Sequence, residues 1–115
     1  YLSVGDGGTP NSAQDIKSLR GKILRFDVSE KNPKPEILAY GLRAPWKSSI
    51  DSKNRMFVGD CGDHRLETVY LLDDLYPTTP YNLGWPVFEG TERRMKDPLM
   101  FLDTLARWDC EVMLG

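Results

Sequence analysis

The sequence has little of what metal-binding, nucleic-acid-binding and membrane-spanning proteins require. It contains one histidine, His64, and two cysteines, Cys61 and Cys110, among 115 residues. Without a CxxC pair or a second histidine, nothing indicates a zinc site built from cysteine and histidine ligands. Fifteen basic residues stand against seventeen acidic ones, so a general binder of nucleic acid or anionic membranes, which needs a basic surplus, is not expected. No apolar run approaches the roughly 20 residues of a membrane span.

The composition is that of a soluble globular protein. Hydrophobic residues make up 40%, charged residues 28% and aromatic residues 10% of the chain, close to the averages for globular domains. Ten glycines and eight prolines favour a loop-rich β protein over a helical bundle. The first residue is Tyr1 rather than methionine, and Gly115 follows directly on an apolar segment. We therefore expect a fragment, in which a missing signal peptide indicates nothing about location. The cysteine pair is open to two interpretations, free thiols or a disulfide.

Short apolar runs separated by turn residues predict strands. The run Lys22–Val28 alternates apolar with polar residues, which is typical of a half-buried strand. Further strands are predicted at residues 1–4, 36–42, 47–50, 55–58 and 68–72. Loops are predicted at Ser29–Pro35 and Asp73–Pro80, because their prolines cannot continue a strand ladder, and a tight turn is predicted at Asp51–Asn54.

Two segments carry apolar residues at helix-like spacing. Ser12–Leu19 has Ser12 as an N-cap and Asp15 three residues further on, and so predicts a short helix. In Asp97–Asp109 the spacing is similar, but further apolar residues interrupt the polar face, and both helix and irregular structure stay open there.

An internal repeat is the most informative feature of the sequence. Leu2–Gly8 (LSVGDGG) is echoed 54 positions later by Met56–Gly62 (MFVGDCG). In each copy an apolar strand runs into Gly-Asp-x-Gly. A period of about 40–55 residues with several short strands per period is what a β-propeller produces, because each small sheet must stack on its neighbours to bury both faces. Val-Gly-Asp is also short enough to recur by chance.

Five ordered blocks extend the repeat into a larger pattern. They are Val4–Gly8, Asn11–Asp27, Pro35–Trp46, Val58–Gly62 together with Glu67–Val69 and Asn82–Pro86, and Phe88–Gly90. In this order the blocks resemble the soluble quinoprotein glucose/sorbosone dehydrogenase family. Members of that family are six-bladed β-propellers that bind pyrroloquinoline quinone (PQQ) and calcium and oxidise sugars or other polyols, most of them in the periplasm or outside the cell. The resemblance covers residues 1–90 and is weak beyond them.

The resemblance implies an all-β fold in which residues 1–115 form about two blades of a single six-bladed propeller domain. The remainder of the propeller, the family's catalytic histidine and the basic residues of later blades are then expected outside these residues. The fragment alone is expected to be inactive, and its exposed blade edges are expected to cause self-association or poor solubility.

The resemblance also assigns candidate site residues. Arg43 corresponds to the family's quinone-facing arginine, and its permanent charge suits negative charge developing on a quinone, which makes it both the catalytic and a cofactor-binding candidate. Gly62 and Asp63 occupy the positions whose backbone carbonyls hold calcium, a hard cation that prefers oxygen ligands. Gly7, in a turn that permits close approach, and Glu67, where the family has an acid near the cofactor, are the other cofactor-binding candidates.

Several polar and aromatic residues near these positions have plain structural interpretations. Asp6 and Asp60 are expected to accept backbone amides in tight turns. His64 is expected to be solvated rather than to act as a base. Trp46 and Trp85 are expected to pack in the core between blades.

Two classes of function follow from the resemblance, of which the first is the leading hypothesis and the second the alternative. The first is part of a PQQ- and calcium-dependent dehydrogenase that transfers a hydride from a sugar or polyol carbon to the quinone and passes electrons to an acceptor the sequence does not identify. The second is a non-catalytic extracellular binding propeller similar to the Hedgehog-interacting family, or an inactive degenerate member. Three departures from the family pattern favour the second class: Ala44 for asparagine, Thr68 for an acid and Leu83 for tyrosine. The compact loop Ser29–Pro35 and the scarcity of cysteine favour a microbial enzyme.

Overall fold

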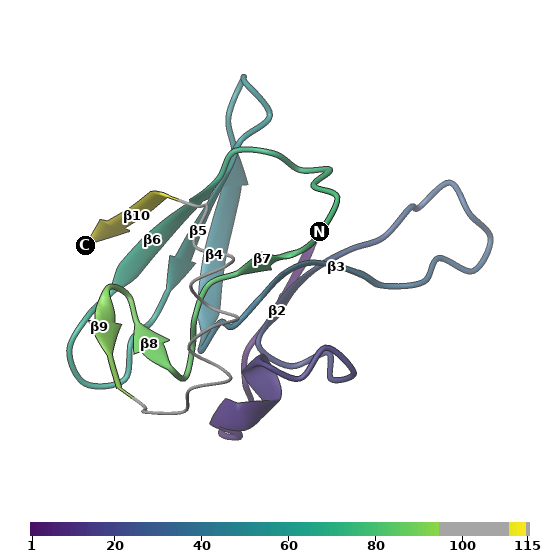
Figure 1. The fold of residues 1–115 in the computed structure, drawn as a ribbon. Coiled ribbons are helices and arrows are strands. Elements are labelled where there is room, and N and C mark those ends of the chain that lie inside the picture. Colours follow the sequence, from purple (N-terminus) through teal and green to yellow (C-terminus); the bar gives the residue numbers. More distant parts are fainter. Residues whose placement is uncertain (95–110, 115) are drawn as a thin grey trace.

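The computed structural model describes residues 1–94 and the strand at residues 111–114. Within these residues the chain forms two four-stranded sheets, one short hairpin and a single 3-10 turn (Figure 1). None of the helical structure described is long and apolar enough to cross a membrane.

The first sheet has the strand order β1-β2-β3-β7. Its members are β1 (Leu2–Val4), β2 (Lys22–Arg25), β3 (Glu36–Tyr40) and β7 (Tyr81–Asn82). The first three strands are antiparallel, whereas β7 runs parallel to β3. Because β7 follows β4, β5 and β6 of the second sheet along the chain, the first sheet is completed by a segment that returns from the second.

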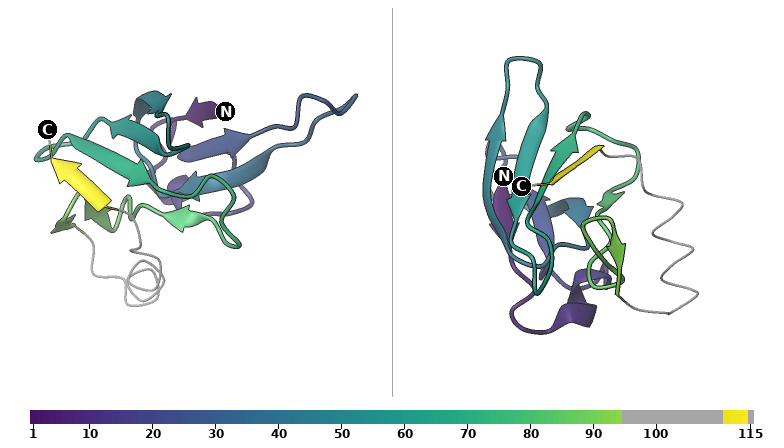
Figure 2. Two further views of the ribbon diagram at one scale, coloured as in Figure 1. Left: turned by 90° about the horizontal axis from the view of Figure 1, so that it is seen from above. Right: turned by 90° about the vertical axis from the view of Figure 1, so that its left-hand side faces the viewer.

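The second sheet is an antiparallel meander with the strand order β10-β6-β5-β4. It comprises β4 (Pro45–Ile50), β5 (Met56–Asp60), β6 (Thr68–Leu72) and β10 (Glu111–Leu114). The hairpin pairs β8 (Phe88–Glu89) with β9 (Glu92–Arg93), and the 3-10 turn η1 covers Pro10–Ala13. The turned views show the β2–β3 loop extending away from both sheets (Figure 2).

Apolar side chains from both sheets form one shared core. The first sheet and the turn after β3 contribute Ile23, Leu38, Ala39 and Leu42, and the second contributes Met56, Val58, Tyr70 and Leu72, with Leu75, Tyr81 and Leu83 from the returning segment. Neither sheet buries both of its faces alone, so their stacking provides most of the burial. The predicted fold class is therefore confirmed: the chain is all-β and has the stacked small sheets of part of a β-propeller.

The predicted strands are all present, and all except β6 have shifted ends. β2 stops at Arg25, three residues earlier than predicted, because the carboxylate of Asp27 accepts the amide and hydroxyl of Ser29 and closes a turn. β4 starts at Pro45, two residues earlier than predicted. The predicted turn and both predicted loops lie outside the strands.

The helix predicted at Ser12–Leu19 is wrong. Only Pro10–Ala13 is helical, as one 3-10 turn. The side chain of Gln14 instead reaches across the fold and donates to Asn82 Oδ1 at 2.9 Å and to the carbonyl of Trp85 at 2.8 Å. Ile16 remains 65% exposed, so its helix-like spacing does not reflect a buried face. The other candidate helix, Asp97–Asp109, lies outside the described residues.

Lys22 is fully buried rather than on a solvated strand face. Its Nζ donates to the carbonyls of Ser12, Ala13 and Arg20 at 3.0, 3.1 and 2.6 Å. Burial lowers the pKa of Lys22 to about 8, although the charge of Asp15 opposes this shift. The buried ammonium therefore ties the loop around η1 to the first strand that follows it.

Gly21 permits a close approach between this loop and the core. Its φ is +66°, and a Cβ added there would lie 2.6 Å from Ala13 Cβ and 2.7 Å from the carbonyl oxygen of Leu42. Gly8 has a similar φ of +76° but nothing within 4 Å of an added Cβ. The two glycines thus share the left-handed backbone and differ in the space around them.

We expect Gly21→Ala to be much more destabilising than Gly8→Ala. Each variant places an alanine in the left-handed region at a cost of about 1–2 kcal/mol, and Gly21→Ala adds steric overlap worth about 1–3 kcal/mol. Urea denaturation of the purified variants measures the difference in the free energy of unfolding. Equal losses for the two variants would contradict the tight packing at Gly21.

Candidate functional site

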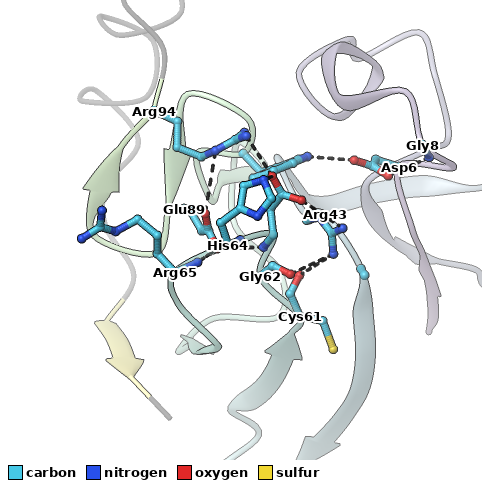
Figure 3. A network of polar contacts seen from close by, with 12 residues as sticks. Asp6, Gly8, Arg43, Cys61, Gly62, His64, Arg65, Glu89 and Arg94 are labelled. Atoms are coloured by element: carbon cyan, nitrogen blue, oxygen red, sulfur yellow. Dashed lines mark hydrogen bonds and ion pairs between the residues drawn. The ribbon is translucent and has the colours of Figure 1, made fainter.

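The loop after β5 brings three of the predicted site residues together. Arg43 precedes β4, and the antiparallel pairing of Pro45 with Asp60 places Arg43 beside this loop. Its Nη1 donates to the carbonyl of Gly62 at 2.9 Å and to that of Cys61 at 3.3 Å. Its Nη2 lies 3.4 Å from Asp63 Oδ1 (Figure 3). The candidate cation thus contacts one of the candidate calcium ligands, the carbonyl of Gly62, and the side chain of Asp63 rather than its carbonyl.

The two aspartates of the sequence repeat hold the backbone of Arg43 in place. Asp60 accepts the amide of Arg43 at 3.1 Å and the amide of Ala44 at 2.7 Å. Asp6 donates its own amide to the carbonyl of Arg43 at 2.8 Å, and its carboxylate accepts the amide of Gly8 at 2.9 Å. The prediction of amides accepted in a tight turn is confirmed for Asp6, whereas Asp60 accepts amides of the distant segment that precedes β4. Burial raises the pKa of Asp60 to about 6, against the effect of the two amides and of the Arg43 charge.

The indole ring of Trp85 lies beside the guanidinium groups of two arginines. The Cζ atoms of Arg43 and Arg94 lie 5.7 and 4.4 Å from the centroid of its ring, within the range of cation–π attraction. Its indole Nε1 donates to Asp6 Oδ2 at 2.9 Å. Trp85 is buried, as predicted, whereas Trp46 is 77% exposed on β4, so the core role predicted for Trp46 is wrong within this chain.

The carboxylate of Asp63 is contacted by two arginines and a histidine. Besides Arg43 at Oδ1, Arg94 Nη2 and His64 Nε2 lie 3.0 and 3.2 Å from Oδ2. The His64 side chain is 79% exposed, which agrees with the prediction of a solvated histidine. Asp63 is therefore shared between two guanidinium groups, and Arg43 is not the free positive charge that the sequence presented.

Glu89 fixes the same loop from the opposite side, and sequence reasoning missed it. Its Oε1 accepts four consecutive backbone amides, those of Asp63, His64, Arg65 and Leu66, at 2.7, 3.0, 2.9 and 3.1 Å. The residue is only 3% exposed. Burial raises the pKa of Glu89, but the four amides outweigh it and bring the pKa down to about 2. The sequence offered one indirect signal for such a residue. The loop after β5 has no strand partner, so its backbone amides require a hydrogen-bond acceptor from another part of the chain.

The remaining candidates lie around this cluster in different ways. Gly62 is packed so closely that an added Cβ would lie 1.8 Å from the carbonyl oxygen of Leu66. This close packing accounts for a glycine at this position, and no bound ligand is needed to explain it. Glu67 Oε1 accepts the amide of Gly62 at 3.3 Å. Gly7, with a φ of +66°, lies next to the side chain of Arg20, 3.4 Å from an added Cβ. The structure thus joins Arg43, Gly62 and Glu67 in one network but places Gly7 against another side chain.

With the guanidinium of Arg43 in place, the arrangement of the loop does not fit a calcium ion. Ca²⁺ takes 6–8 oxygen ligands at about 2.3–2.6 Å. The carbonyl of Gly62 already accepts a hydrogen bond from a guanidinium at 2.9 Å, and a second cation beside Arg43 would be repelled by it. Among the described residues, no group of three or more histidine, cysteine, aspartate or glutamate side chains could hold a metal. The roles of Gly62 and Asp63 as calcium ligands stay predictions.

The stacked sheets and the charged loop define a segment of a β-propeller protein, and comparison with known proteins gives its family. The sequence model described as "Glucose / Sorbosone dehydrogenase" matches residues 1–100. The chain belongs to this glucose/sorbosone dehydrogenase family, as the sequence resemblance indicated.

Two proteins of Arabidopsis thaliana are among its relatives. The chain is 35% identical over 123 residues to the "HIPL2 protein", an alignment that covers 78% of this chain and 17% of that protein. It is 33% identical over 125 residues to the "HIPL1 protein", with 80% of this chain and 17% of that protein covered. The chain thus spans about 17% of the length of these relatives. No solved structure matches it.

We expect Glu89→Gln to destabilise the protein in a pH-dependent manner. The pKa of Glu89 is lowered from 4.5 to about 2 in the folded chain, so its contribution is fully present above pH 4.5 and is lost as the pH falls through 2. At pH 7 the variant should lose about 3 kcal/mol of unfolding free energy, and the gap to the unsubstituted protein should narrow below pH 4.5. Denaturant titrations between pH 2.5 and 7 measure this gap.

The matched control is Glu36→Gln, which removes an exposed carboxylate paired with Arg25 at 2.7 Å. An exposed ion pair of this kind is worth about 0.2–1 kcal/mol. A loss for Glu89→Gln no larger than that of the control, or one independent of pH, would contradict the four-amide contact.

Proposed function

We propose that residues 1–115 are part of a single six-bladed β-propeller domain that acts outside the cytoplasm, in the periplasm or after secretion, as a non-catalytic binding module. The observation that carries this proposal is the engagement of Arg43. A dehydrogenase of the family needs this arginine to face the quinone. Here its guanidinium donates to the carbonyls of Cys61 and Gly62 and is paired with Asp63.

The three departures from the family pattern support the same proposal. Ala44 offers a methyl group, and its amide is already bound to Asp60 at 2.7 Å. Thr68 is buried in β6 opposite Asp60. Leu83 is fully buried within the core. Each residue is thus used for packing or pairing inside the chain, where the family has a polar group.

A second candidate function is a PQQ- and calcium-dependent sugar or polyol dehydrogenase. Membership of the family and the meeting of Arg43 with Gly62 and Asp63 at one loop favour it. In that case Arg43, Gly7 and Glu67 would contact PQQ, and the carbonyls of Gly62 and Asp63 would hold calcium. PQQ would supply the hydride acceptor, and the rest of the propeller would supply the base. Arg43 would first have to release the carbonyl of Gly62.

Reconstitution with PQQ separates the two candidates. We expect the full-length protein that contains residues 1–115, purified and incubated with PQQ and CaCl₂, to show no aldose- or polyol-dependent reduction of a redox dye. PQQ is also expected to leave the tryptophan fluorescence unchanged, because the guanidinium of Arg43 is already bound by the oxygens of the loop. A catalytically active family member under the same conditions is the positive control. Sugar-dependent dye reduction that requires added PQQ would establish the dehydrogenase instead.

A further inference from the structure

The oxygens of three consecutive residues converge on the guanidinium of Arg43. They are the carbonyl oxygens of Cys61 and Gly62, at 3.3 and 2.9 Å, and Asp63 Oδ1, at 3.4 Å. The Arg43 side chain is half-buried, with 32% of its surface exposed. Main-chain oxygens gathered around one half-buried positive group form the kind of environment that hard metal ions occupy in proteins.

The backbone amides of the same loop donate to negatively charged carboxylates. The amide of Gly62 donates to Glu67 at 3.3 Å, and the four amides from residue 63 to residue 66 donate to Glu89. Every backbone N–H from residue 62 to residue 66 thus points to a carboxylate, while the carbonyls of Cys61 and Gly62 and the carboxylate of Asp63 point to Arg43. The N–H groups and the oxygens of the loop therefore point in different directions. The side of the loop that presents the oxygens is the side that requires a cation.

Arg43 cannot easily turn away from this face. Its amide is bound by Asp60 and its carbonyl by the amide of Asp6, and the ring of Trp85 lies beside its guanidinium. Release of the guanidinium would leave two carbonyls and a carboxylate oxygen without their donor in a partly dry site, which is unfavourable.

We propose that Arg43 is the resident cation of this loop and takes the place of a divalent metal ion, so that the loop is closed without metal. This inference rests on the proposed non-catalytic function and specifies what occupies the site. A guanidinium stays charged at every working pH and is covalently attached, so neither chelation nor low calcium removes it. Without it, the oxygens of residues 61–63 face a gap that suits a hard cation.

Terbium luminescence tests the proposal, because Tb³⁺ binds oxygen sites as Ca²⁺ does and is excited by a nearby tryptophan. Trp85 lies beside the site. We expect no tryptophan-sensitised Tb³⁺ signal from this loop in the unsubstituted protein or in Arg43→Lys, which keeps the charge. We expect a saturable signal in Arg43→Met, which excess Ca²⁺ displaces and the additional substitution Asp63→Asn abolishes.

Calcium should likewise raise the melting temperature of Arg43→Met by about 10 °C at a hundredfold excess over its Kd. The matched control is Arg55→Met. It removes the same charge from another half-exposed arginine, one paired with Asp51 at 2.7 Å, and should give neither signal nor shift.

A Tb³⁺ signal in the unsubstituted protein that Asp63→Asn removes overturns the proposal, and so does a folded Arg43→Met variant that binds no Tb³⁺. Should Arg43→Met fail to fold, the unsubstituted protein and its Asp63→Asn variant decide alone: an Asp63-dependent signal refutes the proposal, and its absence supports it. Sugar oxidation is measured separately by dye reduction. Activity with PQQ therefore contradicts the proposed function, whereas metal bound at this loop without activity contradicts only the inference about Arg43.

Discussion

The contact between the Arg43 guanidinium and the carbonyl of Gly62 is the interaction around which the described site is arranged. It joins the segment between the two sheets to the loop after β5. Glu89 and Glu67 take the amides of that loop, and Asp63 balances the charge of the arginine. The N–H groups of the loop meet negative charges and its carbonyl groups meet a positive charge. The loop is therefore held in one arrangement although it has no strand pairing of its own.

The sequence repeat acquires its structural meaning through Arg43. Asp6 follows a strand of the first sheet and Asp60 is the last residue of a strand of the second, and both bind the backbone at or next to Arg43. Asp6 also holds the indole of Trp85. Two equivalent positions of a repeated unit therefore converge on one residue between the sheets, which is how stacked blades can build a site that neither contains alone.

Much of the fold followed from the sequence, because strand periodicity and turn residues are local signals. The β6 strand has the predicted bounds Thr68–Leu72, and the repeat led to stacked sheets. The helix at Ser12–Leu19 failed because the long-range bonds of Gln14 to Asn82 and Trp85 override local spacing. The site was predicted in part: the resemblance identified Arg43, Gly62 and Asp63 but not their contact. Glu89 could not be found, because one carboxylate that accepts four amides depends on tertiary proximity, which no local pattern records.

The parallel strand β7 makes the two sheets depend on each other. It completes the first sheet only after the chain has passed through β4, β5 and β6 and returned over the core. The first sheet therefore needs partners far away along the chain, whose pairing is entropically costly until the second sheet has formed. Opening of either sheet removes support from the other, so the two should gain and lose protection against hydrogen exchange as one cooperative unit.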